Sequence, residues 1–195
     1  MTSLLPLVVV AVVLLVPILV YNRLVALRHR LRRGFRQVCA QLRLRYDVVP
    51  HLVEVAKPHL AHDRATLEAV IVARNEAQQA ERKAVARPED GAAIAAVIDA
   101  ERTLSEAIEH LIAASEAFPA LAADADLQQL RRELAANESR FAYARRSYNR
   151  AVTLYNTYRR RAPASQIAAA FGFRAALPFE TGAEAREASA VAAER

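Results

Sequence analysis

An uninterrupted apolar run from Leu4 to Tyr21 passes directly into an arginine-rich segment, and this transition constrains the fold most strongly. About eighteen apolar residues span about 27 Å as a helix, enough to cross the hydrocarbon core of a bilayer. No charged side chain precedes the run, whereas the arginines that follow it before the first acid, Asp47, are Arg23, Arg28, Arg30, Arg32, Arg33, Arg36, Arg43 and Arg45. By the positive-inside rule, residues 1–22 are predicted to form a single transmembrane anchor, with the N-terminus outside and the remaining chain in the cytoplasm.

Two other interpretations of the apolar run fit less well. A cleaved signal peptide needs positive charge before its apolar part and small residues after it, but Tyr21-Asn22-Arg23 follows directly. A buried helix of a soluble protein does not explain why the arginines gather on one side of the run. Pro17 lies inside the run and leaves the Val13 carbonyl without its helical partner, which predicts a kink.

The composition after the anchor is that of a helical protein. Glycine is scarce, with 4 among 195 residues, tryptophan is absent, and good helix formers dominate. The remaining length, about 170 residues, suffices for one domain with its own core. The formal charge of +6 comes mainly from the segment next to the anchor, which indicates attraction to anionic lipid head groups rather than to nucleic acid. The lone cysteine, Cys39, is expected to be a small buried side chain.

Apolar residues at three-to-four spacing predict four helices, over about 23–46, 50–84, 88–118 and 124–160. Pro50 is expected to end the first helix in a tight reversal, and Pro58 to bend the second. Asp124 or Asp126 is the expected N-cap of the fourth. Near-equal helices with short connections predict an all-α fold, in which the transmembrane helix continues into an antiparallel up-down-up-down four-helix bundle over residues 23–162.

Polar residues interrupt three of the predicted apolar seams. They are Asp63, Glu101 and Asn137, and their heights along the bundle differ by only about 6 Å at 1.5 Å per residue. We therefore expect one buried polar layer, with Arg140 on the fourth helix and Arg33 or Arg36 on the first as partners. Such a layer acts most simply as a device that sets helix register, and a ligand or metal pocket is the alternative.

Residues 163–180 are too apolar for a solvated tail. Pro163 ends the fourth helix, and the large apolar residues that follow are Ile167, Phe171, Phe173, Leu177 and Phe179. Because the fourth helix returns to the membrane, this segment either lies on the bilayer surface or packs over the base of the bundle. In the first case the membrane interface comprises Arg23, Arg28, Arg30, Arg32, Arg33, Phe171, Phe173 and Phe179. Residues 181–195 lack an apolar face and are predicted to be disordered.

Tyrosine-asparagine pairs recur one heptad apart on the fourth helix, at Tyr148-Asn149 and Tyr155-Asn156. The tyrosines fall on the apolar seam and are expected to pack in the core, with their hydroxyls at its edge. The asparagines flank the seam and are expected to bond across to another helix.

Several stretches together resemble the LemA family of bacterial membrane proteins. In chain order they are Tyr21-Asn22-Arg23-Leu24-Val25; Arg45-Tyr46-Asp47 with Pro50-His51-Leu52-Val53-Glu54; Ala144-Arg145-Arg146-Ser147-Tyr148-Asn149 with Tyr155-Asn156; and Phe171-Gly172-Phe173 with Pro178-Phe179-Glu180. The resemblance covers nearly the whole chain except the tail. It implies one N-terminal helix in the bacterial cytoplasmic (inner) membrane, a cytoplasmic antiparallel bundle and no established enzymatic activity. The chain departs from the family pattern at Phe35, usually Trp; His51, usually Asn; Pro58, usually Gly; and Arg161-Ala162-Pro163, where a Phe commonly precedes the Pro.

The residues form no recognisable catalytic or metal-binding pattern. A di-iron bundle places Glu-x-x-His on facing helices, and this chain contains no Glu-x-x-His. His59 and His62 are close enough in sequence to share a helix face beside Asp63, but zinc takes three or four protein ligands. There is no glycine-rich phosphate loop, and Cys39 has no evident base. We therefore expect no cofactor, no metal and no enzymatic activity.

Two binding functions remain. In the first, the chain is a membrane-tethered scaffold whose bundle surface recruits a partner protein, with self-association as a variant. In the second, the chain acts on the lipid bilayer itself through its basic neck and Phe-rich C-terminal segment. The first is favoured because a rigid bundle on an anchor offers mainly a surface for binding.

Overall fold

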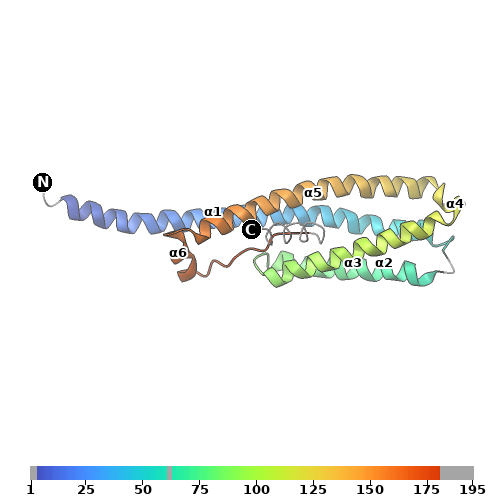
Figure 1. The fold of residues 1–195 in the computed structure, drawn as a ribbon, viewed down its shortest axis with the longest axis horizontal. Coiled ribbons are helices and arrows are strands. Elements are labelled where there is room, and N and C mark those ends of the chain that lie inside the picture. Colours follow the sequence, from blue (N-terminus) through green and yellow to red (C-terminus); the bar gives the residue numbers. More distant parts are fainter. Residues whose placement is uncertain (1–3, 61–62, 181–195) are drawn as a thin grey trace, which may run out of the picture.

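The computed structural model describes residues 4–60 and 63–180, with side chains from residue 15 onward. All regular structure in these residues is helical, which confirms the all-α prediction. Four long helices alternate in direction along one axis (Figure 1), and two short helices, α4 and α6, follow the third and the fourth. The bounds are α1 Leu4–Ala56, α2 Arg64–Ala86, α3 Gly91–Glu116, α4 Pro119–Ala122, α5 Ala125–Arg160 and α6 Ala164–Ala170.

Helix α1 is longer than predicted and contains Pro50. The prediction that Asp47–Pro50 reverses the chain is therefore wrong. Burial of Leu52, Val53 and Ala56 against the other helices holds the last turns in place. The reversal comes between Ala56 and Arg64, where Pro58 lies in a turn instead of bending a helix.

Side-chain caps fix the N-terminal ends of α3 and α5. Asp124 accepts hydrogen bonds from the backbone N–H groups of Asp126 and Leu127 and caps α5, as predicted. Asp90 caps α3 in the same way through the N–H of Ala92. Helix α3 therefore starts at Gly91, after Pro88, and the chain leaves it at Glu116, before Phe118.

The bundle is built from two closely packed pairs. Helix α1 packs mainly on α5, and α2 packs mainly on α3. Contacts between α1 and α2 connect the two pairs. Gly34 of α1 permits the close approach of α5, since an added Cβ there would lie 3.2 Å from the Cα of Tyr148. The buried side chains of all four long helices form one apolar core.

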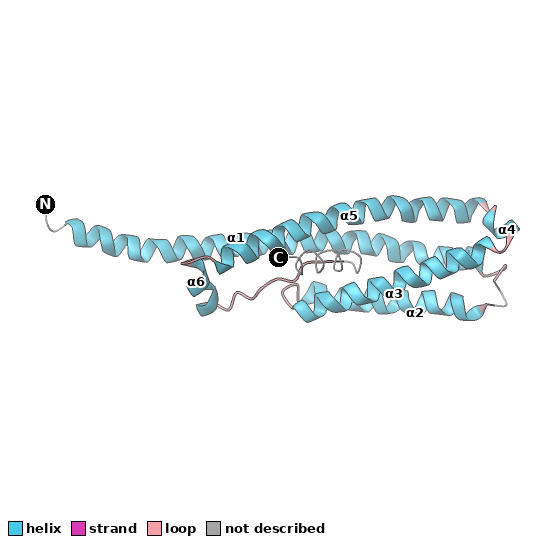
Figure 2. Ribbon diagram, in the orientation of Figure 1, coloured by secondary structure: helices cyan, strands magenta, loops and turns pink. Residues whose placement is uncertain are grey.

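After α6 the chain runs back along the bundle without regular structure, between the α1/α5 pair and the α2–α3 hairpin (Figures 1 and 2). We call residues 171–180 the strap. Phe173 and Phe179 in the strap are 4% and 0% exposed, so they lie in the core. Their assignment to a membrane interface is therefore wrong, and the strap packs on the bundle, as the second alternative predicted.

None of the helices, over the residues that are described, combines the length and the apolarity needed to span a bilayer. The predicted anchor falls largely outside the described side chains, which begin at residue 15. The predicted disordered tail, residues 181–195, also lies outside the described residues.

Candidate functional site

Two asparagines of α5 form paired hydrogen bonds with the backbone of the strap. Asn149 donates from Nδ2 to the carbonyl oxygen of Phe179 at 3.0 Å and accepts at Oδ1 from the Phe179 N–H at 2.8 Å. Asn156 makes the same pair of bonds with Ala176, at 2.8 and 3.0 Å. Each side-chain amide thus pairs with one strap residue as a neighbouring β-strand would. The prediction that these asparagines bond to another helix is wrong.

The distance between the two asparagines along α5 matches the distance between the two strap residues that they bind. Asn149 and Asn156 are two helical turns apart, which is about 10.5 Å. Ala176 and Phe179 are three residues apart, which is about 10 Å in an extended chain. The strap therefore runs antiparallel to α5 and meets both asparagines in register.

Further α5 side chains bind strap carbonyl oxygens. The hydroxyls of Tyr148 and Tyr155 donate to the carbonyls of Leu177 and Arg174, both at 2.8 Å. Burial raises the pKa of both tyrosines, so their hydroxyls keep the proton that they donate. Both rings are buried on the α5 seam, as predicted, and their hydroxyls turn to the strap.

The two buried strap phenylalanines occupy aromatic sites at opposite ends of the groove. Phe179 meets Phe141 of α5 edge to face, with ring centroids 5.8 Å apart. Phe173 packs against Tyr21, at 5.7 Å, and the guanidinium of Arg28 lies 5.4 Å from its ring centroid. We call this site the strap groove: Tyr21, Arg28, Phe141, Tyr148, Asn149, Tyr155, Asn156 and Arg159.

The basic neck divides into paired and exposed arginines. Arg28 and Arg32 both bind the carboxylate of Glu89, each with an Nε to Oε1 distance of 2.8 Å. Arg23, Arg30 and Arg33 are exposed. Phe171, which is 63% exposed, packs against Tyr21 at the same end of the bundle, with the two rings tilted. The predicted interface residues that keep an exposed side chain are therefore Arg23, Arg30, Arg33 and Phe171.

The predicted polar layer does not form as one unit. Asp63 caps α2, accepting bonds from the N–H and hydroxyl of Thr66, because α2 begins at the turn rather than at Pro50. Arg140 is exposed. Glu101 and Asn137 are buried, but Asn137 donates to the backbone carbonyl of Gln41 at 3.1 Å rather than to Glu101.

Glu101 is held by two adjacent residues of α1 that were not predicted to be its partners. The Tyr46 hydroxyl donates to Oε1, and Arg45 Nη1 lies 3.6 Å from Oε2. Burial raises the pKa of Glu101, although Tyr46 and Arg45 oppose the shift. No seam pattern marks Arg45, which lies beside the apolar stripe of α1 and turns its head group inward.

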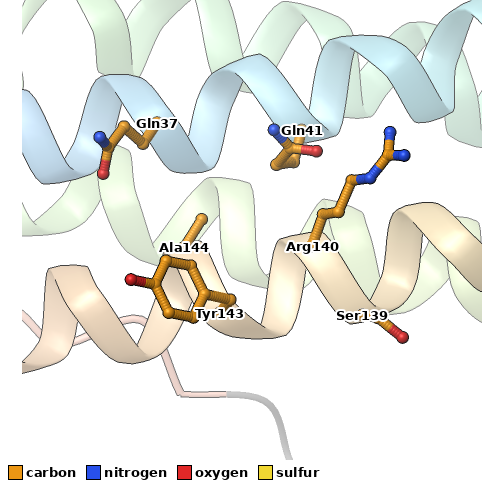
Figure 3. A pocket seen from close by; sticks show the side chains of 6 residues that line it. All are labelled: Gln37, Gln41, Ser139, Arg140, Tyr143 and Ala144. Atoms are coloured by element: carbon orange, nitrogen blue, oxygen red, sulfur yellow. The ribbon is translucent and has the colours of Figure 1, made fainter.

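Arg140 lines a groove on another face of the α1/α5 pair (Figure 3). Gln37 and Gln41 from α1 line one side, and Ser139, Arg140, Tyr143 and Ala144 from α5 line the other, around a volume of about 470 Å³. The Oε1 atom of Gln41 is buried and has no hydrogen-bond partner among the described residues.

Metal-ligating side chains do not gather in the described part of the chain: no three His, Cys, Asp or Glu residues there are placed to hold an ion. His59 is half-buried at the turn after α1, and its predicted neighbour His62 lies outside the described residues.

Comparison with known proteins places the chain in a family. No curated protein matches the sequence. The family model described as LemA family matches residues 34–192, which is most of the chain and includes α5 and the whole strap. The resemblance noted in the sequence is confirmed over these residues, and the protein belongs to the LemA family.

Proposed function

We propose that this protein is a membrane-tethered helical scaffold that recruits a partner protein through its bundle. One observation carries the proposal: α1 is a single helix from Leu4 to Ala56, so the apolar run and the core of the bundle share one helix. A bundle joined in this way to a membrane segment is held at a set position and orientation. Its role is binding, with no catalytic step proposed.

The exposed arginines support the proposed orientation. Arg23, Arg30 and Arg33 follow the apolar run within the first turns of the bundle, where anionic lipid head groups of the cytoplasmic leaflet would meet them. In this orientation the N-terminus lies on the outer side of a bacterial cytoplasmic membrane, and the bundle lies on its cytoplasmic side. A reporter fused to the C-terminus should be active when it works in the cytoplasm and inactive when it needs export; the reverse pattern would overturn the topology.

The anchor itself is tested by placing charge in the apolar run. Val10→Arg together with Val13→Arg should release the chain from membranes, because each arginine costs about 2.5–3.5 kcal/mol at the centre of a bilayer helix. Ala26→Arg is the matched control, since Ala26 is exposed on the neck. Sedimentation of membranes separates the outcomes, and a double variant that stays in the membrane fraction after an alkaline wash contradicts the anchor.

Recruitment is tested by crosslinking in native membranes. Membranes are first equilibrated at low or high salt, and the full chain is then crosslinked, solubilised and captured so that its partners under the two conditions can be compared. A scaffold retains specific partners at high salt, because a packed interface is screened less than surface charge is. Loss of every crosslinked protein under both conditions contradicts recruitment.

A second function is favoured by Phe171 alone. This side chain is 63% exposed beside Tyr21, close to the neck arginines, an arrangement typical of an aromatic and basic membrane interface. The burial of Phe173 and Phe179 leaves the rest of the Phe-rich segment outside this function. A photoreactive residue at position 171 should crosslink to lipid if the segment touches the bilayer, and to protein or solvent alone if it does not.

A further inference from the structure

The hydrogen bonds that join the strap to the groove use the main chain of the strap. Five carbonyl groups accept bonds from the groove, those of Phe173, Arg174, Ala176, Leu177 and Phe179, and the N–H groups of Ala176 and Phe179 donate to the two asparagines. Arg174, Ala175 and Leu177 turn their side chains to solvent. The groove therefore recognises extended backbone, and any chain that presents the same backbone groups can make these bonds.

Large buried side chains of the strap occupy two positions. Phe173 and Phe179, six residues apart, fill the sites beside Tyr21 and Phe141. Proline is acceptable at the position of Pro178, because the groove uses no N–H there, and is excluded at the positions of Ala176 and Phe179, whose N–H groups are bonded. These rules describe a ligand with two large aromatic residues separated by five others.

Charge in the groove does not match the strap at Arg174. Arg28 and Arg32 share the single carboxylate of Glu89. Arg174 borders the same small hollow as Arg28 and Glu89, and Arg159 bonds the carbonyl one residue before it, at 3.3 Å. A ligand with an acidic residue at this position would gain an attraction that the strap lacks.

We propose that the strap groove is a binding site for an extended, acidic peptide segment of a partner protein. When no partner is bound, the strap occupies the groove. The proposal rests on the scaffold function and names its recruiting surface. The strap is attached to the same chain and therefore competes at an effective concentration of about millimolar. A partner binds to the fraction of molecules whose groove is open, so weakening the strap should tighten binding of a peptide in trans.

The test uses the full chain in lipid nanodiscs and a labelled ten-residue peptide with the sequence of residues 171–180 in which glutamate replaces Arg174. Peptide binding is followed by fluorescence anisotropy. Phe179→Ala in the chain should lower the apparent Kd at least tenfold, because it weakens the competing strap. Phe173→Ala is a second variant of the same kind, used if the first fails to fold by circular dichroism.

Groove variants should act in the opposite direction. In the Phe179→Ala background, Asn149→Ala and Asn156→Ala should each raise the Kd about tenfold. Asn75→Ala is the matched control, since Asn75 is exposed on α2, away from the strap. A peptide with proline at the position of Ala176 should bind at least tenfold more weakly, and one with arginine restored at position 174 should bind more weakly than the glutamate peptide.

Three results would overturn the proposal. One is that folded strap variants bind the peptide no better than the unchanged chain. Another is that the asparagine variants leave the Kd unaltered. The third is that mass photometry of the Phe179→Ala chain mixed with unchanged chain shows dimers joined by an exchanged strap, which would make a second copy the occupant. If partners captured from membranes survive Asn149→Ala with Asn156→Ala, the scaffold function stands and its recruiting surface lies elsewhere.

Discussion

Arg74 of α2 donates from Nε to the backbone carbonyl oxygen of Tyr46 in α1 at 3.2 Å. In an uninterrupted helix that carbonyl would accept from the N–H of residue 50, but residue 50 is proline and has none. The guanidinium of one helix thus completes the hydrogen bonding of another. This bond satisfies the carbonyl that Pro50 leaves without a helical donor, in a helix that continues to Ala56.

Replacing Arg74 should destabilise the bundle only while Pro50 is present. Arg74→Met leaves the Tyr46 carbonyl without a donor and should lower the free energy of unfolding by about 1–3 kcal/mol. Pro50→Ala supplies the missing N–H and should recover most of that loss. Chemical unfolding of the two single variants and the double variant measures the coupling, and strictly additive losses would contradict this account.

The Cys39 thiol should be almost inert in the folded chain. The side chain is 2% exposed, and burial raises its pKa from 9.0 to about 12, with the Glu81 carboxylate adding to the shift. Three pKa units reduce the thiolate fraction at pH 8 about 1,000-fold. Alkylation should therefore be slow in buffer and fast in denaturant, with intact mass as the readout. Fast alkylation of folded protein would contradict the burial.

Glu101 should make the bundle less stable as pH rises. Its pKa is raised by burial, so between the unfolded pKa and the folded pKa the native state holds a proton that the unfolded state has lost. Stability from this group is complete below the unfolded value and falls as pH rises through the folded value. Glu101→Gln keeps a carbonyl acceptor for Tyr46 and should flatten this part of the curve. Melting temperatures from pH 4 to pH 8 for both chains provide the test; parallel curves would contradict it.

Gly34→Ala should lower stability although alanine favours helices. The added Cβ would lie 3.2 Å from the Cα of Tyr148, so α1 and α5 must move apart. Overpacking of this kind costs about 1–3 kcal/mol, against about 1 kcal/mol gained in helix propensity. Gly91→Ala is the matched control, because its nearest neighbour, Leu177 Cβ, would lie 3.8 Å away. A Gly34→Ala variant as stable as Gly91→Ala would contradict the prediction, because it would show that α1 and α5 move apart without a loss of stability.

Seam patterns predicted the long helices well, and local breaking rules failed where another helix intervened. On α3 the buried residues follow the three-to-four spacing by which the helix was predicted, and they are Ile94, Val97, Glu101, Leu104, Ile108, Leu111 and Ser115. By local sequence rules Pro50 should end the helix, and the bond from Arg74 to the carbonyl of Tyr46, 28 residues earlier, is a long-range contact that those rules do not include. The misplaced turn then put Asp63 at mid-height, which produced the false polar layer.

The strap was beyond reach of a periodicity argument, because its contacts run through backbone groups that every residue carries. Its two buried phenylalanines, Phe173 and Phe179, have the even spacing of one strand face, but the residues between them do not alternate between buried and exposed. The signal that did exist was the heptad repeat of Tyr148-Asn149 and Tyr155-Asn156. This repeat identified the side chains that bind the strap. It did not show that they bind an extended segment rather than a helix.

In the proposed membrane orientation, the single helix α1 joins the apolar run to the far end of the bundle and would act as a lever. The stretch from Asn22 to Ala56 rises about 50 Å above the head groups. A tilt of about 20°, average for a membrane helix, then carries the far tip sideways by about 17 Å. Any change in that tilt would reposition the outer end of the bundle while leaving its internal packing intact.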